Sequence, residues 1–381
     1  IIFFTKSQIA YAYDAAKLPE RIPEEANTEL SIKGPRDGFV EDLNKNVALV
    51  RRRLRTNSLH FEQLVVGKRS ETSVALLYIH DFVRPEIVDE ALHRIQNIEM
   101  DTLFSSAQLE EVISDSSYSL FPLLTYTGRP DFVVDCLVHG RLAIIVDGAP
   151  IAVIAPVNLT LLMKSPEDIY FPTAIVSFQI IIRLIGLLIA MFLPGFWIAL
   201  VSYNLEQLPF PLLATIVTTR IGLPMPGTLE AFMMLALFEV FREAGIRLPK
   251  AVGQTIAVVG GIIVGDAVIQ AGLASTPMLI MAALTAVATF TLVNQTLGSA
   301  VTIVRTVVMV FASFLGMYGF ILSVIGIVFY LAKLESFGIP YLTPLSPFKR
   351  KAFFAAVFKK PLKDSETQFL QNEHERQGDK S

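Results

Sequence analysis

The sequence is poor in the residues from which most catalytic and metal sites are built. Its 381 residues include one cysteine, Cys136, which excludes an intrachain disulfide and a thiolate metal cluster. Cys136 stands in the apolar run 132–138, so we expect it to be a small buried hydrophobic residue. The five histidines have no ligand spacing, and no glycine-rich phosphate loop accompanies them. We therefore predict a protein that is not an enzyme and that uses no metal and no cofactor.

A strong charge of one sign is also missing. The formal net charge is −3, and no basic stripe alternates with aromatic residues, which excludes a nucleic-acid-binding protein. The chain begins at Ile1 without a methionine, and its apolar start, residues 1–4, is too short for the core of a signal peptide. We expect these first residues to form a strand in a piece of a longer protein.

Apolar residues make up 52% of the chain, but they are unevenly distributed. Residues 1–173 have the composition of a soluble protein, residues 174–345 that of a membrane domain, and residues 346–381 form a basic and then polar tail. The sequence therefore predicts a mixed α/β cytoplasmic domain followed by an all-α polytopic membrane domain with a re-entrant or broken helix.

Local patterns in the first 173 residues predict helices interleaved with strands, as in a small mixed α/β fold. Helices are expected at 36–57, from Pro85 onwards and at 131–138, and strands at 73–82, 142–147 and 151–156. The run Ser165-Pro166-Glu167-Asp168 predicts a capped helix start. Asp131, Asp135 and Asp147 stand near turns, and we expect turn and cap roles for them rather than catalysis.

Two long stretches of the membrane part are almost free of charge. Residues 174–203 contain one charged side chain, Arg183, and residues 251–332 contain two, Asp266 and Arg305. About 20 apolar residues suffice to span a bilayer, so spans are expected at 174–203, 252–272, 276–297 and 299–332. The last contains Gly316-Met317-Tyr318-Gly319, which fits one tilted helix or a tight hairpin. Basic residues at 349–363 place the tail in the cytoplasm, and four crossings are the most economical count.

The stretch 204–250 carries the polar chemistry of the membrane part. Its proline-bounded segment 209–226 is too short to cross and predicts a re-entrant or half-helix. Glu230 either meets the positive end of a helix capped by Thr228 or lines a cation path. The pairs Glu239–Arg242 and Glu243–Arg247 have ion-pair spacing, and we expect Arg242, Glu243 and Arg247 to form a salt network at the helix end. Glu239 lies deeper, between Phe238 and Val240, and is the better candidate for lining a cation path. Arg183 requires a carboxylate partner within the bundle, for which Glu230 and Glu239 are the candidates.

Small residues mark close helix packing. Gly261 and Gly265 form a GxxxG pair, and Gly316 and Gly319 belong to a second stripe, which we expect within the bundle or between subunits. Asn294 stands in a polar group that is expected to satisfy the backbone at a break between two spans. The candidate pore or polar membrane-core residues are Glu230, Glu239, Arg183, Arg220, Asp266, Gln254 and Asn294.

Several motifs, spread in order along nearly the whole chain, resemble the A subunit of GerA-type spore germinant receptors. They are GPRDGF at 34–39, DGAP at 147–150, SPED at 165–168, RIGLPMP at 220–226, Glu230, FREAGIRLP at 241–249, VGQ at 252–254, QAGL at 270–273 and SFGIPY at 336–341. The chain departs from the pattern at Asp266, where relatives carry an uncharged residue, and at 292–295, where many carry a proline. The related stage V sporulation subunit shares this architecture.

The resemblance implies a multi-pass subunit of the spore inner membrane with its N- and C-terminal regions in the cytoplasm. Its implied partners are a transporter-like B subunit and a lipoprotein C subunit, and its implied activity, as a homo-oligomer in membrane lipid, is a gated channel for monovalent cations. A secondary transporter with a midplane substrate site and a non-conducting scaffold are the alternatives. The absence of an internal repeat in 174–332 disfavours the transporter.

Overall fold

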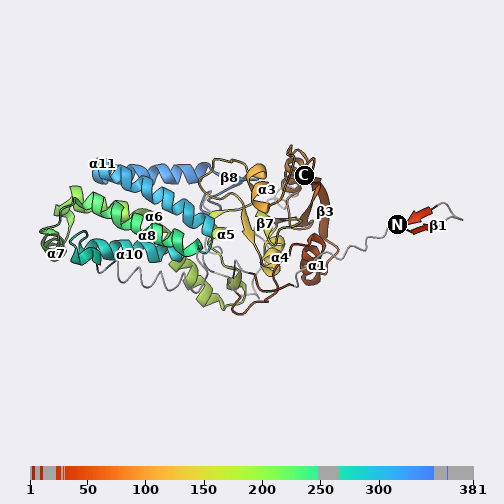
Figure 1. Ribbon diagram of the computed structural model, residues 1–381, viewed down its shortest axis with the longest axis horizontal. Coiled ribbons are helices and arrows are strands. Elements are labelled where there is room, and N and C mark those ends of the chain that lie inside the picture. The colour runs from red at the N-terminus through yellow and green to blue at the C-terminus, as the bar shows by residue number, and fades with distance from the viewer. Residues whose placement is uncertain are drawn as a thin grey trace, which may run out of the picture.

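The computed structural model describes residues 2–4, 9–11, 23–26, 29, 31–247, 265, 267–346 and 358. Figure 1 shows two regions side by side, a sheet with its covering helices and a bundle of long helices. We call residues 31–172 the α/β region and residues 173–333 the helical bundle. The near end of the bundle is the end beside the sheet, and the far end is the opposite one.

The α/β region is built on a five-stranded antiparallel sheet in the order β3-β4-β6-β7-β5. Its strands are β3 (Leu59–Val66), β4 (Thr72–Ile79), β5 (Thr125–Thr127), β6 (Leu142–Val146) and β7 (Ala152–Ala155). The strand pair β1 (Ile2–Phe4) and β2 (Ile9–Tyr11) is separate from it. The predicted strands at 73–82, 142–147 and 151–156 are thus confirmed as β4, β6 and β7.

Helices cover both faces of this sheet, which explains why its central strands are apolar throughout. Alternate residues of β4 point in opposite directions: Ala75 and Leu77 pack toward one face, and Val74 and Leu76 toward the other. The first face is covered by α1 (Leu43–Arg53) and α4 (Pro130–Val138), and the second by α2 (Pro85–Gln96) and α3 (Ser106–Ile113). Cys136 of α4 is fully buried in the first core, as expected.

The first predicted helix is shorter than its apolar periodicity indicated. Asp42 caps α1 by accepting a hydrogen bond from the backbone N–H of Lys45, so the helix begins at Leu43 rather than at residue 36. Phe39 is buried against the same core from the irregular segment before the helix, so it fits the helical spacing without belonging to the helix.

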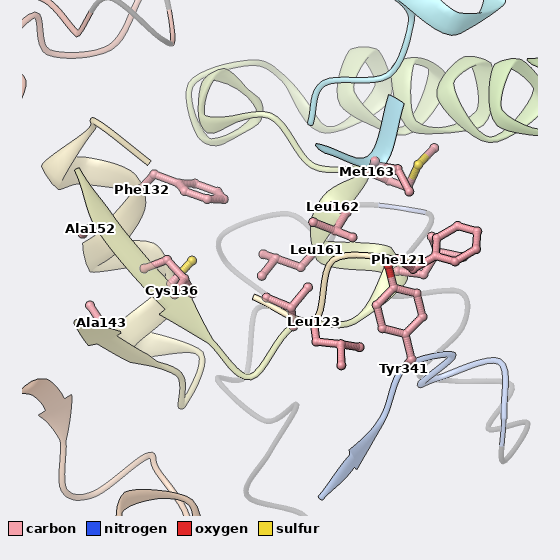
Figure 2. Packing of buried hydrophobic residues seen from close by; sticks show 14 of the residues in the cluster. Phe121, Leu123, Phe132, Cys136, Ala143, Ala152, Leu161, Leu162, Met163 and Tyr341 are labelled. Atoms are coloured by element: carbon pink, nitrogen blue, oxygen red, sulfur yellow. The ribbon is translucent and has the colours of Figure 1, made fainter. Parts of the chain in front are cut away.

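The α/β region leads into the bundle through α5 (Leu159–Leu162) and the short 3-10 helix η1 (Pro166–Ile169). Ser165 and Asp168 form a capping box on η1, which confirms the predicted capped start. Figure 2 shows residues of α5 beside Phe121 and Tyr341, whose ring centroids are 6.2 Å apart. Tyr341 follows the bundle in sequence, so the chain returns to this core after its last helix.

The described helices of the bundle are α6 (Thr173–Tyr203), α7 (Phe210–Arg220), α8 (Gly227–Arg247), α10 (Thr276–Phe290) and α11 (Gln295–Lys333), with the 3-10 helix η2 (Leu205–Gln207) after α6. Within the described residues, α6 and α11 are long and apolar enough to cross a membrane. The region is therefore helical, as predicted.

Element α11 is a helical hairpin, which decides between the two predicted possibilities. Gly316 breaks it with φ 60° and ψ −138°, a conformation open essentially to glycine alone. Both of its outer ends contact the α/β region: Asn294 Nδ2 donates to Thr125 Oγ1 (2.9 Å), and the backbone N–H of Leu120 donates to the hydroxyl of Tyr330 (3.0 Å). We call residues 295–315 and 317–333 its first and second arms.

Contacts along the bundle give the direction of each helix. Tyr203 ends α6 at the far end, where its hydroxyl donates to the carbonyl of Ser313. Between α8 and α10, Glu230 binds Ser275 at the same end, while Arg242 lies beside Gly298 near the sheet. Five described segments, namely α6, α8, α10 and the two arms, thus run between the two ends, more than the four passages expected.

The short chain after the bundle is fixed to the α/β region. It contains the two-stranded sheet of β8 (Glu335–Ser336) and β9 (Ile339–Pro340). The Ser336 hydroxyl donates to the carbonyl of Leu123 (2.7 Å) and accepts from the N–H of Val157 (3.0 Å). The near end of the bundle is therefore held at both its entry and its exit.

Candidate functional site

Arg183 lies at the near end of α6, bound to the acid that caps η1. Its guanidinium donates to both carboxylate oxygens of Asp168 at 2.6 and 3.0 Å and to the carbonyl of Met163 at 3.0 Å. The expectation that Glu230 or Glu239 pairs with Arg183 is wrong. The reason is that α6 enters the bundle directly from η1, so a long side chain in its third turn reaches back to the α/β region.

Glu230 is a buried acid at the far end, in the first turn of α8. Its side chain is 1% exposed, and one carboxylate oxygen accepts from the Ser275 hydroxyl (2.6 Å) and from the Ser275 backbone N–H. The other oxygen has no hydrogen-bond partner among the described residues. The helix begins at Gly227, so Thr228 lies within it rather than capping it. Glu230 therefore joins the starts of α8 and α10.

Arg220 lies next to this position, at the C-terminal end of α7. Its guanidinium is close to Gly227, where an added Cβ would lie 2.9 Å from one of its nitrogens. Helix α7 is short, and its apolar residues Phe210 and Val217 are exposed. It connects α6 to α8 at the far end (Figure 1).

A second charged group lies farther along the bundle, between three helices. Glu239 of α8 binds Arg242 one turn later and Arg305 of the first arm, whose Nη2 lies 3.3 Å from Glu239 Oε2. Arg305 also donates to Thr289 Oγ1 of α10 (3.3 Å) and is only 5% exposed. We call these four residues the Glu239 cluster. The pairing of Glu239 with Arg242 confirms the prediction from spacing, whereas the role of Arg305 was missed.

The Glu239 cluster sets one acid against two arginines between apolar helices, and Arg305 is nearly buried there, whereas the Glu239 side chain is 33% exposed. Charges interact more strongly there than in water, and removing Glu239 would leave the buried Arg305 without its counter-charge. The sequence signal for Arg305 is its isolation, because it is the one charged residue in 267–332. Such a residue in an apolar helix requires a partner on a neighbouring helix.

The remaining predicted residues divide into described and undescribed ones. Asn294 accepts from the N–H of Leu297 (2.9 Å) and so caps the first arm at the break after α10, as expected for the interrupted backbone. Gly319 of the second arm lies against the carbonyl of Phe311 of the first arm, and Gly265 lies near Leu279. Gln254, Gly261 and Asp266 lie outside the described residues.

A charged group that sequence reasoning did not find lies in the α/β region beside the bundle. Arg129 is 2% exposed and donates to both oxygens of Asp131 (3.1 and 2.6 Å) and to Glu167 (2.5 Å). The Tyr170 hydroxyl donates to Asp131 (2.8 Å). We call these four residues the Arg129 cluster. Asp131 is therefore an ion-pair partner in addition to standing in the first turn of α4.

Protonation in the Arg129 cluster follows from burial and hydrogen bonding. Burial raises the pKa of Glu167, but the hydrogen bonds from Arg129 and from the Lys33 N–H outweigh it and bring the pKa below its ordinary value of 4.5. Burial and the hydrogen bond to Asp131 both raise the pKa of Tyr170. The Arg129 cluster is thus an ion-pair group inside the α/β region. Gly34 passes directly over it, and a Cβ there would overlap the Arg129 guanidinium.

Comparison of the sequence with known proteins identifies the family of the chain. The chain matches the family described as Bacillus/Clostridium GerA spore germination protein over residues 1–369. It is 45% identical to spore germination protein XA of Bacillus anthracis over 361 residues, which are 95% of this chain and 73% of that protein. It is 39% identical over 327 residues to the uncharacterized membrane protein YfkQ of Bacillus subtilis (strain 168), covering 86% of this chain and 64% of the relative.

Part of the chain is also similar to a solved structure. It is the crystal structure of the N-terminal domain of the A subunit of the Bacillus megaterium spore germinant receptor GerK3, with 36% identity over 31% of this chain and 94% of that one, at a TM-score of 0.27. The motif resemblance is thereby confirmed by whole-chain similarity: this chain belongs to the GerA family of spore germination proteins.

Proposed function

We propose that this chain is the A-type subunit of a spore nutrient germinant receptor and that its bundle crosses the spore inner membrane. The described segments make five passages, and Arg247 and Gly265, which flank the gap between α8 and α10, lie toward opposite ends. With both the α/β region and the chain after Lys333 at the near end, an even number is required, and six is the smallest that fits. We therefore propose six crossings instead of the four expected from the sequence.

The exposed surface of the bundle is suited to an apolar surrounding such as the interior of a membrane. Large apolar side chains are exposed along α6 and along both arms of α11, among them Phe178, Ile185, Phe314 and Phe329. Bundles in water seldom expose so continuous an apolar surface. The α/β region would then lie in the cytoplasm, and α7 on the other side, with its exposed apolar residues at the interface.

We further propose that several copies of the bundle form a gated channel for monovalent cations. The observation that carries this proposal is the Glu239 cluster, because charges inside an apolar bundle are costly and usually serve ions or substrates. In the proposed closed state, Arg305 and Arg242 neutralise Glu239. Opening would release Glu239 from Arg305, so that the carboxylate meets a passing cation. Glu230, with one oxygen unsatisfied among the described residues, is the second proposed contact.

The proposed partners are a transporter-like B subunit that senses the nutrient and a lipoprotein C subunit. The gating signal would reach the bundle through the α/β region, which the Arg183–Asp168 ion pair connects to α6. The subunit itself, in this proposal, conducts only after the partners release it.

The test is cation efflux from liposomes that contain the purified chain. We expect Arg305→Gln to leak potassium or sodium ions without partners, and Glu239→Ala or Glu230→Ala in that background to reduce the leak. Glu206→Ala is the matched control, since Glu206 is an exposed acid at the far end. Saturable flux coupled to a substrate would point to a transporter, and no flux from any variant to a scaffold; either result contradicts the channel.

A further inference from the structure

The loop between α3 and β5 is fixed to the place where the chain leaves the bundle. We call residues 115–121 the Tyr118 loop. At its start, Asp115 accepts a hydrogen bond of 2.8 Å from the backbone N–H of Phe337, which follows the second arm in sequence. Near its end, the N–H of Leu120 donates to the hydroxyl of Tyr330, in the last turn of the second arm, at 3.0 Å. Both ends of the loop are thus held at the near end of α11.

The loop brings no free charge to this position. Residues 116–128 contain no charged side chain. The acid at the start of the loop, Asp115, forms an ion pair of 2.7 Å with Arg94, whose guanidinium also lies over the Phe337 ring at 4.4 Å. Unpaired charges are costly where water is scarce, so a loop without them is compatible with contact to an apolar surrounding.

Tyr118 stands in the middle of the loop and has no cover from the rest of the chain. Its side chain is 100% exposed, more than any other large hydrophobic side chain of the described residues. The backbone around it is closed by a turn in which the Ser119 N–H donates to the carbonyl of Ser116 (3.2 Å). Phe121, three residues later, is instead buried, with its ring centroid 6.2 Å from that of Tyr330. Tyr118 is therefore an exposed aromatic side chain on a loop with fixed ends.

The second arm presents an apolar surface at the level to which the loop is bound. Val328 and Phe329, the neighbours of Tyr330 in sequence, are 53% and 73% exposed, and the arm ends at the exposed Lys333. Tyrosines gather at the surfaces of a bilayer, where the ring meets apolar groups and the hydroxyl meets water, and lysines near helix ends extend to the headgroups. The loop is thus attached where the proposed bundle would leave the membrane.

We propose that the Tyr118 loop is a membrane contact of the α/β region, with the Tyr118 ring in the headgroup layer beside the second arm. The ring buries apolar area there and keeps its hydroxyl hydrated. Lipid is the occupant that fits, because the loop continues the apolar surface of the second arm, which faces lipid in the proposed topology. This inference rests on the proposed membrane crossing of the bundle and is independent of cation conduction.

The test is quenching of tryptophan fluorescence by nitroxide-labelled lipids in nanodiscs that hold the full chain. The chain has one tryptophan, Trp197, so Trp197→Phe gives a background into which single reporters are placed. Tyr118→Trp reports on the loop, and Ile325→Trp, at an exposed position of the second arm, reports on the membrane crossing. Val65→Trp is the matched control, because Val65 is 65% exposed on the edge strand β3, on the side of the sheet away from the bundle (Figure 1).

We expect a nitroxide on the headgroup to remove several-fold more emission from Tyr118→Trp than from Val65→Trp. A nitroxide in the middle of the acyl chains should quench Ile325→Trp most strongly of the three, since a tyrosine-like side chain at the bilayer surface stays shallow. If Trp197→Phe lowers the melting temperature, the same quenching is measured with Trp197 kept and the wild-type emission subtracted.

Three results overturn the proposal, and they are distinguishable. If Ile325→Trp is quenched while Tyr118→Trp is quenched no more than Val65→Trp, the loop does not contact lipid, and the membrane crossing stands. If Ile325→Trp is not quenched by the acyl-chain nitroxide, the crossing itself fails, and the membrane contact of the loop fails with it. Emission of Tyr118→Trp that shifts to shorter wavelength with more chains per disc, without quenching by lipid, would assign the loop to contact between copies.

Discussion

At the scale of single residues, the Arg129 cluster determines how the α/β region responds to acid. Replacing Glu167 by Gln leaves the buried Arg129 with one acid instead of two, and we expect a loss of about 2 kcal/mol in the free energy of unfolding. The matched control is Glu90→Gln, which removes a more exposed partner of Arg94 and should cost under about 0.5 kcal/mol. Thermal unfolding of the full chain in detergent measures both.

The same residue gives a pH dependence of known sign. The pKa of Glu167 is below 4.5 in the folded chain, so its contribution to stability is present above pH 4.5 and is lost as the pH falls through the lower, folded-state pKa. We expect the stability difference between wild type and Glu167→Gln to be largest near neutral pH and to shrink below pH 4.5. A difference that stays constant down to pH 3 would show that the Glu167 charge contributes nothing.

Residue-level prediction from the sequence succeeded where partners are close in the chain. Glu239 and Arg242 share a helix face, so spacing alone indicated their contact. Arg183 was assigned to the wrong acid because its partner depends on how α6 leaves η1, which no spacing rule states. Arg305 and Thr289 meet only through packing of two helices, and a periodic pattern cannot identify such pairs.

At the scale of elements, the hairpin of α11 depends on one backbone conformation. Gly316→Ala would place a Cβ against the Tyr203 ring at a φ of 60°, and we expect it to destabilise the chain by about 2 kcal/mol or more. The matched control is Gly326→Ala in the second arm, where nothing lies within 4 Å of the added atom and alanine favours the helix. Equal melting temperatures for the two variants would contradict the hairpin geometry.

Helices with strong local signals were predictable, and short or edge elements were not. Pro85 starts α2 as its position indicated, because proline is favoured in the first helical turn. Strand β5 has three residues, too few for an alternating pattern, and β3 is an edge strand whose inward and outward residues alternate only partly. The α11 hairpin remained undecided, since a glycine in an apolar run permits either a straight helix or a turn.

At the scale of the whole molecule, the proposed topology has the α/β region and α7 on opposite sides of the membrane. We predict that a membrane-impermeant maleimide labels Glu206→Cys and Lys68→Cys from opposite faces of oriented vesicles. Wild type is the blank, because its one cysteine, Cys136, is buried. Labelling of both positions from the same face would refute the proposed topology.

The organisation into an α/β region and a helical region was predictable because it follows from composition alone. The way the regions meet was not, since Asn294 binds Thr125 and Tyr330 binds the backbone of Leu120, and these partners are distant in sequence. Contacts of this kind arise from tertiary packing, which local sequence patterns do not state.

The central claim is that charged residues inside the bundle face an ion route, and its most direct test is electrical. Currents of Arg305→Gln channels in planar bilayers, with and without Glu239→Gln, report the preference for cations over anions. We predict that Glu239→Gln lowers this preference several-fold, while Glu206→Gln leaves it unchanged, because a carboxylate at a narrow point sets the sign of the permeant ion. Identical reversal potentials with and without Glu239→Gln would contradict the claim.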